Sequence, residues 1–203
     1  KSRSIREASA ILANKPIILL MMGGRERIMA AAEKLMGLRP YQEVAIAPLL
    51  AIAEVQPPTL YYHFKDKEGL FVEWAAQAFS GIGEKFRLRA GTSLTEGLTA
   101  FSTIFLLEVP FDIDQVLRDI PGLVRPESQE AVYNAYFQAL YEPLCAILIE
   151  AMERNELPPE PIGPVADVFL AGLHQLRKKG APGYEVTTAK WYAQRFVNGF
   201  GAA

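Results

Sequence analysis

The sequence is poor in the residues that catalytic and metal sites most often use. Its 203 residues include a single cysteine, Cys145, and two histidines, His63 and His174. One cysteine cannot form an intramolecular disulfide, which fits a cytoplasmic protein, and its apolar neighbours indicate an inert core thiol. No metal-ligand spacing, phosphate-binding loop or nucleophile elbow is found, and the acids Asp112 and Asp114 fall in a probable loop, where we expect them to be solvated. We therefore expect neither an enzyme nor a metal or other cofactor.

The sequence also lacks a long apolar run and a strong charge of either sign. No run reaches the ~20 residues that a membrane span requires, so no membrane partner is expected. Apolar residues make up 50% of the chain, enough for a sizeable core, and the net charge is only −2. The charge is unevenly placed, because residues 1–67 carry ten Lys and Arg against six Asp and Glu, whereas residues 68–203 carry eleven against seventeen. A basic first part and an acidic remainder indicate a DNA reader joined to a domain with another task.

Helical periodicity runs through the chain, and no stretch has the alternation of a convincing strand. We therefore predict an all-α fold of about nine helices. Ser93 should cap one helix, with Glu96 completing a capping box, and Pro143 should kink the longest one. The predicted helical segments are 25–36, 44–53, 59–64, 70–89, 94–109, 111–120 (short or irregular), 128–152, 165–178 and 187–200.

The most informative stretch runs from Gln56 to Leu70. A proline suits the first turn of a helix, so Pro57 or Pro58 can open a helix over 59–64. Leu60 and Phe64 lie four residues apart, share one face and can turn inward. The side chains that then point elsewhere are Thr59, Tyr62 and His63. A short helix with a buried back and such a front suits the reading of DNA bases in a groove.

Residues 59–70, Thr-Leu-Tyr-Tyr-His-Phe-Lys-Asp-Lys-Glu-Gly-Leu, closely resemble the recognition-helix signature of TetR-family (tetracycline-repressor-like) transcriptional regulators. The closely matching part covers roughly residues 25–70. The resemblance implies a three-helix, helix-turn-helix DNA-binding domain at 25–70 and a helical ligand-binding and dimerisation domain at 71–203. Residues 1–24 would then be an unimportant leader or an N-terminal arm.

The family resemblance also implies a function and partners. The chain would be a cytoplasmic, ligand-responsive repressor that a small molecule releases from a palindromic, double-stranded operator. It would form a homodimer through its last two helices, although the apolar stripes of these helices would look the same in an intrachain core. Residues implied to contact DNA are Arg25, Arg27, Pro58, Thr59, Tyr61, Tyr62, His63, Lys65 and Lys67. Thr59, Tyr62 and His63 would face the major groove, while Tyr61 and Lys67 hold phosphates. Other roles stay open: solvated charge for the two arginines, a packed ring for Tyr61, and a structural or capping role for His63.

Three positions depart from the family pattern. Val44 replaces the Thr or Ser that caps the first helix of the motif, Glu54 replaces the Gly of the turn, and Gln56 replaces a small capping residue. A residue other than Gly in a left-handed turn costs roughly 1–2 kcal/mol, so the turn is altered or Glu54 is strained. These departures keep an alternative open, namely a helical ligand-binding, dimeric protein whose DNA-reading head is degenerate.

Aromatic residues of the later helices can line an apolar cavity for a ligand, although each could equally be plain core. His174 lies off the main apolar stripe of its helix and could meet a ligand, the dimer partner or solvent. The aromatic supply favours a largely apolar or planar effector. The predicted ligand-binding residues are Phe101, Phe105, Glu108, Tyr133, Asn134, Phe137, Tyr141, Phe169 and His174.

Overall fold

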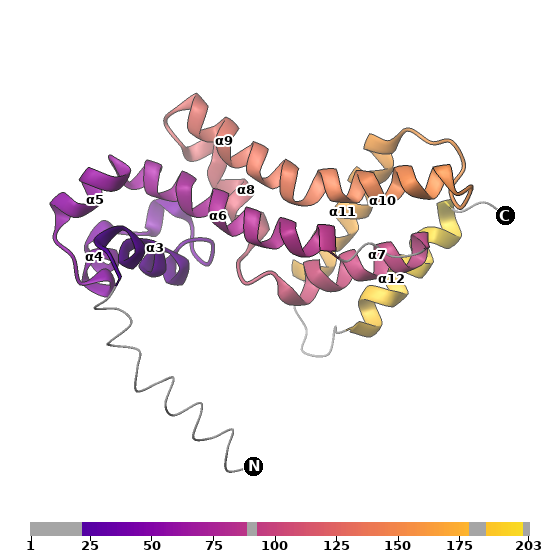
Figure 1. Ribbon diagram of the computed structural model, residues 1–203, viewed down its shortest axis with the longest axis horizontal. Coiled ribbons are helices and arrows are strands. Elements are labelled where there is room, and N and C mark those ends of the chain that lie inside the picture. Colours follow the sequence, from indigo (N-terminus) through magenta and orange to yellow (C-terminus); the bar gives the residue numbers. More distant parts are fainter. Residues whose placement is uncertain (1–21, 89–92, 179–185, 201–203) are drawn as a thin grey trace, which may run out of the picture.

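The computed structural model describes residues 22–88, 93–178 and 186–200 (Figure 1). Most of the predicted leader lies outside these ranges. The described residues are helical and contain no strand, which confirms the all-α prediction. The same ranges contain ten α-helices, of which two, Pro126–Tyr136 and Glu142–Glu153, are continuous through a π turn. Counted as one, they give nine helical units besides a short 3-10 turn at Tyr41–Glu43, in agreement with the predicted number.

Three short helices form the first part of the molecule, which we call the reading head (residues 24–66). They are α3 (Gly24–Leu35), α4 (Ile46–Ala53) and α5 (Pro57–Phe64). The core of the reading head contains the buried side chains of Ile28, Ala32, Leu49, Ala53, Leu60 and Phe64. Helix α4 begins two residues later than predicted, so Pro48 falls in its first turn, where a missing N–H has no helical partner to lose.

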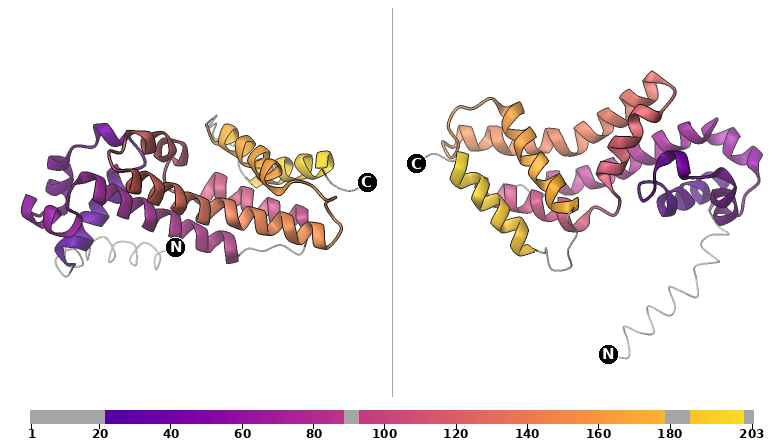
Figure 2. Two further views of the ribbon diagram at one scale, coloured as in Figure 1. Left: turned by 90° about the horizontal axis from the view of Figure 1, so that it is seen from above. Right: turned by 180° about the vertical axis from the view of Figure 1, so that it is seen from behind.

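Helix α6 (Lys67–Leu88) leads from the reading head into the rest of the chain, as Figure 1 shows. The remaining helices form the body. They are α7 (Leu94–Thr103), α8 (Ile113–Asp119), α9 (Pro126–Tyr136), α10 (Glu142–Glu153), α11 (Ile162–Lys178) and α12 (Val186–Phe200). Helix α9 packs along α6, α12 packs on α7, and α11 packs on α10. Seen from behind, α8 and α11 both lie in front of the long α9–α10 unit (Figure 2, right).

Two π turns interrupt this pattern, at Ile104–Glu108 after α7 and at Phe137–Tyr141 between α9 and α10. The second one ends just before Pro143, which stands in the first turn of α10. A proline inside a helix removes one backbone hydrogen bond and crowds the preceding turn, and a wider turn is one way to accommodate it. The predicted segment 128–152 is therefore two helices joined by a π turn, and α9 already begins at Pro126.

Aromatic rings hold the far end of the body together. Phe86 and Phe101 stack with ring centroids 4.3 Å apart, and Phe169 contacts Phe196 of the last helix at 4.9 Å. As predicted, the Ser93 hydroxyl caps α7 by accepting a hydrogen bond from the Glu96 N–H at 3.3 Å. No single helix of the described residues is long and apolar enough to cross a membrane, although the bent pair Leu94–Glu108 and Ile113–Gly122 passes on length and composition alone.

Candidate functional site

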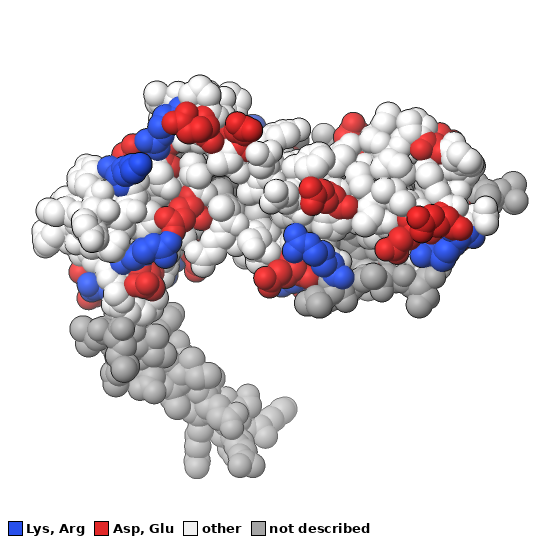
Figure 3. Space-filling model, turned by 45° about the horizontal axis from the view of Figure 1, so that its top comes forward, with Lys and Arg blue, Asp and Glu red and all other residues white. Residues whose placement is uncertain are grey.

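Helix α5 has the two faces that the sequence predicted. It begins at Pro57, and its Leu60 and Phe64 side chains are buried, with 0% and 3% exposure. On the opposite side Tyr62 is 83% exposed and Tyr61 is 52% exposed. On the face that Figure 3 shows, the end of the molecule that carries α5 has few charged side chains. This surface therefore offers aromatic rings, rather than a dense group of cations, to whatever it contacts.

The remaining predicted residues of the α5 surface differ in exposure. Pro58, His63 and Lys65 are exposed, and Thr59 is partly buried. The methyl group of Thr59 lies so close to Gly24 that a Cβ atom there would be 2.7 Å from it. Thr59 thus also packs α5 against the start of α3, whereas His63 stands free of the core beside the Tyr62 ring, at 4.9 Å.

Three predicted DNA contacts are held by groups of the protein itself. Arg25 forms an ion pair with Glu73 and lies over the Phe64 ring, 5.8 Å from its centroid. Arg27 donates a hydrogen bond to the Glu54 carbonyl oxygen at 3.2 Å. A separate contact places the Lys67 ammonium group 4.2 Å from the Tyr41 ring centroid. These cations brace the helix-turn-helix, so any contact with a phosphate requires them to exchange or share these partners.

The turn between α4 and α5 is strained at Glu54. The sequence left two possibilities, an altered turn or a strained Glu54, and the structure shows the second. Glu54 adopts the left-handed conformation with φ +53°. Gln56 precedes the first residue of α5 without capping it through its side chain. The motif therefore keeps its geometry with a residue that is costly in the turn and without a side-chain cap on α5.

Replacing Glu54 by Gly is expected to raise the free energy of unfolding by about 1 kcal/mol, because Gly adopts this conformation without a Cβ clash. Arg27 contacts the backbone oxygen of Glu54, so its hydrogen bond survives the change. Asn155→Gly is the matched control, since Asn155 also has a positive φ, +59°, but Asn tolerates it better. Urea unfolding of both variants measures the difference, and an equal or larger gain for Asn155→Gly would contradict this account.

A charged cluster joins the reading head to the start of α9. The Arg125 guanidinium donates to both carboxylate oxygens of Asp66, at 2.7 and 3.0 Å. Glu68, only 7% exposed, accepts the backbone N–H groups of Val124 and Arg125 at 2.9 and 3.0 Å. We call Arg125, Asp66 and Glu68 the Arg125 cluster. It fixes the turn after α5 to the body of the molecule.

The environment of the Arg125 cluster favours ionised carboxylates. The hydrogen bond from Arg125 is the main reason that the pKa of Asp66 lies below its ordinary value. Burial alone would raise the pKa of Glu68, but hydrogen bonds from Ser128 and from the backbone of Val124 and Arg125 outweigh it, so this pKa is lowered as well. Both acids therefore stabilise the fold in their charged form.

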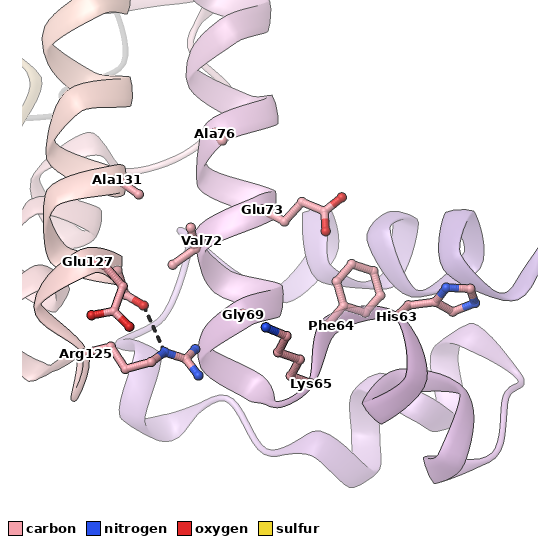
Figure 4. A pocket seen from close by; sticks show the side chains of 11 residues that line it. His63, Phe64, Lys65, Gly69, Val72, Glu73, Ala76, Arg125, Glu127 and Ala131 are labelled. Carbon is pink, nitrogen blue, oxygen red and sulfur yellow. Dashed lines mark hydrogen bonds between the residues drawn. The ribbon is translucent and has the colours of Figure 1, made fainter.

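A hollow of about 520 Å³ lies beside this cluster, between the end of α5, α6 and α9 (Figure 4). Figure 4 shows Arg125 on its α9 side and Lys65 on its α5 side. Its floor includes the small or apolar residues Gly69, Val72 and Ala76. Gly69 is required here, because a Cβ atom would collide with the Phe64 carbonyl oxygen at the end of α5.

Helix α8 provides a second connection to the reading head. Asp119, which is buried, accepts the Tyr41 N–H at 3.0 Å, and the Asp112 N–H donates to the Gly37 oxygen at 2.8 Å. Burial raises the pKa of Asp119 although the Tyr41 N–H opposes the shift. Gly37 has φ +74° and is enclosed by Trp74 and other side chains, which leaves no room for a larger residue. The reading head is thus attached to both α8 and α9.

The predicted ligand-binding residues separate into three groups. Phe101, Phe105 and Phe169 are fully enclosed in the core, with at most 2% exposure. Glu108 pairs with Lys85 at 3.3 Å at the end of the first π turn. Tyr133, Asn134, Phe137 and Tyr141 lie on α9 or in the second π turn. His174 of α11 instead contacts Asp114 of α8 and the Phe105 ring of the first π turn.

Sequence reasoning missed the acids and the tyrosine that accompany the last group. Asp114 belongs to α8, not to a loop, and its side chain is only 14% exposed, so the prediction that it is solvated was wrong. It lies 2.8 Å from His174 Nδ1, while Asp112 is exposed as expected. Burial raises the pKa of Tyr136, as do the nearby Tyr133, Asp114, Asp167 and Tyr141. No local sequence signal could have shown that these residues meet, because they come from three helices.

A second hollow, of about 420 Å³, lies between Leu38 of the reading head and Arg177 of α11. The Arg177 guanidinium donates to the backbone oxygens of Phe105, Val109 and Phe111 at 2.6, 2.9 and 2.6 Å. It therefore fixes the connection between α7 and α8. Neither this hollow nor the one in Figure 4 is lined by the predicted aromatic residues. Within the described ranges, no group of three or more His, Cys, Asp or Glu side chains could hold a metal ion.

Comparison with known proteins gives a family match and a fold match. Residues 28–74 match the model of bacterial regulatory proteins of the tetR family. No curated protein matches the chain. A TetR-family transcriptional regulator from Agrobacterium tumefaciens has a similar structure, with a TM-score of 0.70, 16% identity, and coverage of 88% of this chain and 98% of that one.

Two further solved structures contain small molecules. FadR from Bacillus subtilis, in complex with stearoyl-CoA, has a TM-score of 0.70 at 14% identity, covering 87% of this chain and 99% of that one. A candidate transcriptional regulator from Saccharomonospora viridis, in complex with choline, has a TM-score of 0.71 at 16% identity, covering 88% and 98%. At these identities the likeness shows the fold, in which an N-terminal helix-turn-helix domain is followed by a helical domain.

Proposed function

We propose that this chain, whose residues 28–74 match the model of the tetR family, is a TetR-family repressor that a small molecule releases from a palindromic operator. The observation that carries the proposal is the two-faced helix α5, with Leu60 and Phe64 buried and Tyr62 83% exposed. Exposed side chains on a braced short helix are the usual means of reading base edges in the major groove.

Within this proposal Tyr62 and His63 contact bases, and Thr59 does so at the edge of the surface. Tyr61 and Lys65, both exposed, are placed to meet phosphates on either side, with Pro58 at the start of the helix. Arg25, Arg27 and Lys67 join them only by exchanging or sharing the protein partners that hold them in the unbound chain.

The homodimer is proposed to form through α11 and α12. These helices expose large apolar side chains, namely Val168 at 53%, Val186 at 58% and Trp191 at 52%. Exposed apolar groups on adjacent helices favour association with a second copy. A two-fold dimer places two copies of α5 on successive major grooves, so the operator is palindromic.

Effector control is proposed to act through the two connections of the reading head. A molecule that binds the body more tightly in one arrangement shifts the population toward it. The connections from α8 to Tyr41 and from Arg125 to Asp66 then carry the change to α5. That proteins of similar fold were crystallised with stearoyl-CoA and with choline supports a small-molecule effector for this body.

The test is selection of bound sequences from a genomic or random DNA pool with the purified protein at fixed salt, because binding strength depends on salt. We expect one enriched palindrome. Tyr62→Ala and His63→Ala should each weaken binding to it by about 10- to 100-fold, corresponding to the loss of one base contact. Ile149→Ala is the control, since Ile149 is also a large exposed side chain but lies on α10, outside the proposed sites, and it should leave the affinity unchanged.

A different result would favour the second candidate function. If no sequence is enriched while the protein still dimerises and binds a ligand, the chain is a helical ligand-binding protein with a degenerate reading head. The unfavourable Glu54 conformation and the missing side-chain cap at Gln56 are the observations on which that candidate depends.

A further inference from the structure

Aromatic rings and carboxylates gather where α8 and α11 meet the second π turn. Tyr133 and Tyr136 are neighbours on α9 with ring centroids 6.3 Å apart. Phe137 and Tyr141 stack within the π turn at 4.7 Å. Tyr133 is 54% exposed, so a large aromatic face at this junction is open to solvent. We call Tyr133, Tyr136, Phe137 and Tyr141, with Asp114 and Asp167, the tyrosine–aspartate cluster.

The two acids of this cluster come from different helices and approach the same tyrosines. Burial is the main reason that the pKa of Tyr136 is raised. Asp114 of α8 and Asp167 of α11 both lie near the Tyr136 hydroxyl and raise this pKa further. Asp167 also interacts with the Tyr141 side chain and lies near Cys145. Asp167 itself is exposed, whereas Asp114 is only 14% exposed. One carboxylate is thus available at the surface and one lies deeper.

The basic side chains nearest the cluster are already engaged. Arg177 of α11 is directed at three backbone oxygens of the α7–α8 connection. His174 pairs with Asp114 at 2.8 Å and contacts the Phe105 ring at 5.0 Å. Glu142, at the start of α10, adds another negative charge near Cys145. Among the described residues around the cluster, acids therefore outnumber the cations that could neutralise them.

The backbone here departs from a regular helix. The π turn Phe137–Tyr141 supplies two of the rings, and the π turn Ile104–Glu108 supplies Phe105, which contacts His174. Single π turns are rare and occur frequently at functional sites, because they redirect side chains that a regular helix would point elsewhere. Both π turns of the described chain border this junction.

The geometry points to an organic cation, a quaternary or protonated amine with small apolar substituents, as the effector bound at the tyrosine–aspartate cluster. Aromatic faces attract such cations, and an adjacent carboxylate adds a charge that neutral or anionic molecules cannot use. This inference rests on the proposed function and names the chemical class of its effector. Because the cluster joins α8 to α9, an occupant contacts both helices that hold the reading head.

The test uses three molecules with the same six-carbon chain, namely hexyltrimethylammonium, 1-hexanol and hexanoate. Each is titrated by calorimetry into the purified full-length protein, and then into its complex with the selected operator. We expect the cation to bind and release DNA, and the other two to bind at least about fivefold more weakly. Asp167→Asn should weaken cation binding by about three- to fivefold. Asp167→Glu should restore much of it.

Two further variants separate the aromatic contribution from a folding effect. Tyr133→Leu removes the exposed aromatic face and should weaken cation binding by about threefold, whereas Tyr133→Phe retains the face and should not. Glu153→Gln, which removes an exposed acid at the end of α10, is the control for net charge and should have no effect.

The outcomes distinguish this inference from the proposed function. Equal or tighter binding of hexanol or hexanoate, no binding of any of the three, or an Asp167→Asn variant that binds the cation normally would overturn the inference. Operator selection measured without ligand would still support the repressor. Cation binding that depends on Asp167 and Tyr133, in a protein that selects no DNA, would support the site and contradict the repressor.

Discussion

Arg177→Met is expected to lower the free energy of unfolding by about 3 kcal/mol, because hydrogen bonds to charged groups contribute about 1.5–3 kcal/mol each and part of that is offset by burying the charge. The guanidinium donates to the oxygens of Phe105, Val109 and Phe111 within 2.9 Å. The Phe105 oxygen lies within the first π turn, and the Val109 and Phe111 oxygens lie in the connection to α8, where a regular helix supplies no partner. Methionine fills a similar volume and leaves all three oxygens without this donor.

Arg118→Met is the matched control, because Arg118 is exposed and its ion pair with Asp112 is 3.7 Å long. A surface pair of this kind contributes at most about 1 kcal/mol. Arg177→Lys should recover only part of the loss, since an ammonium group cannot reach three separated oxygens as a planar guanidinium does. Urea unfolding measures all three variants. A loss for Arg177→Met no larger than for Arg118→Met would show that the three oxygens find solvent or other partners.

Much of the fold could be predicted because local rules and packing agree. Leu60 and Phe64 are buried as their spacing requires, and Ser93 caps α7 as its sequence indicates. The two π turns could not be predicted, because one wide turn leaves the apolar pattern on either side nearly helical. The start of α4 was also missed, because the predicted start at Val44 lies two residues before the observed start at Ile46. The later start places Pro48 in the first turn of the helix.

The candidate site was predictable only where it is contiguous in sequence. The exposed surface of α5 comes from eight successive residues, so a family resemblance located it. The connections of the reading head join residues far apart in the chain, such as Glu68 with Arg125, and no periodicity links them. Asp114 was misjudged for the same reason, since its burial depends on His174 of another helix. The sequence therefore predicted the two domains but not the contacts that connect them.

Glu68→Ala tests these contacts and is expected to lower the free energy of unfolding by about 2–3 kcal/mol, because two partly buried N–H groups and the Arg125 side chain lose a charged partner. Its carboxylate accepts the N–H groups of Val124 and Arg125, directly before α9, and it also pairs with the Arg125 side chain at 3.2 Å. Operator affinity should fall at least fivefold even where the protein remains folded, since the turn after α5 loses part of its anchor. Glu127→Ala, in the exposed first turn of α9, should change the unfolding free energy by less than about 0.5 kcal/mol.

The dependence on pH separates the charged cluster from simple packing. The pKa values of Asp66 and Glu68 are lower in the folded chain than their ordinary values. The stability that these acids contribute is therefore present above about pH 4.5 and is lost as pH falls below it. The difference between the wild type and Glu68→Ala should be constant from pH 7 to about pH 5 and should shrink toward pH 3 in urea unfolding. A difference that stays constant down to pH 3 would mean that Glu68 acts by filling space, and the charge-based connection between α5 and α9 would have to be abandoned.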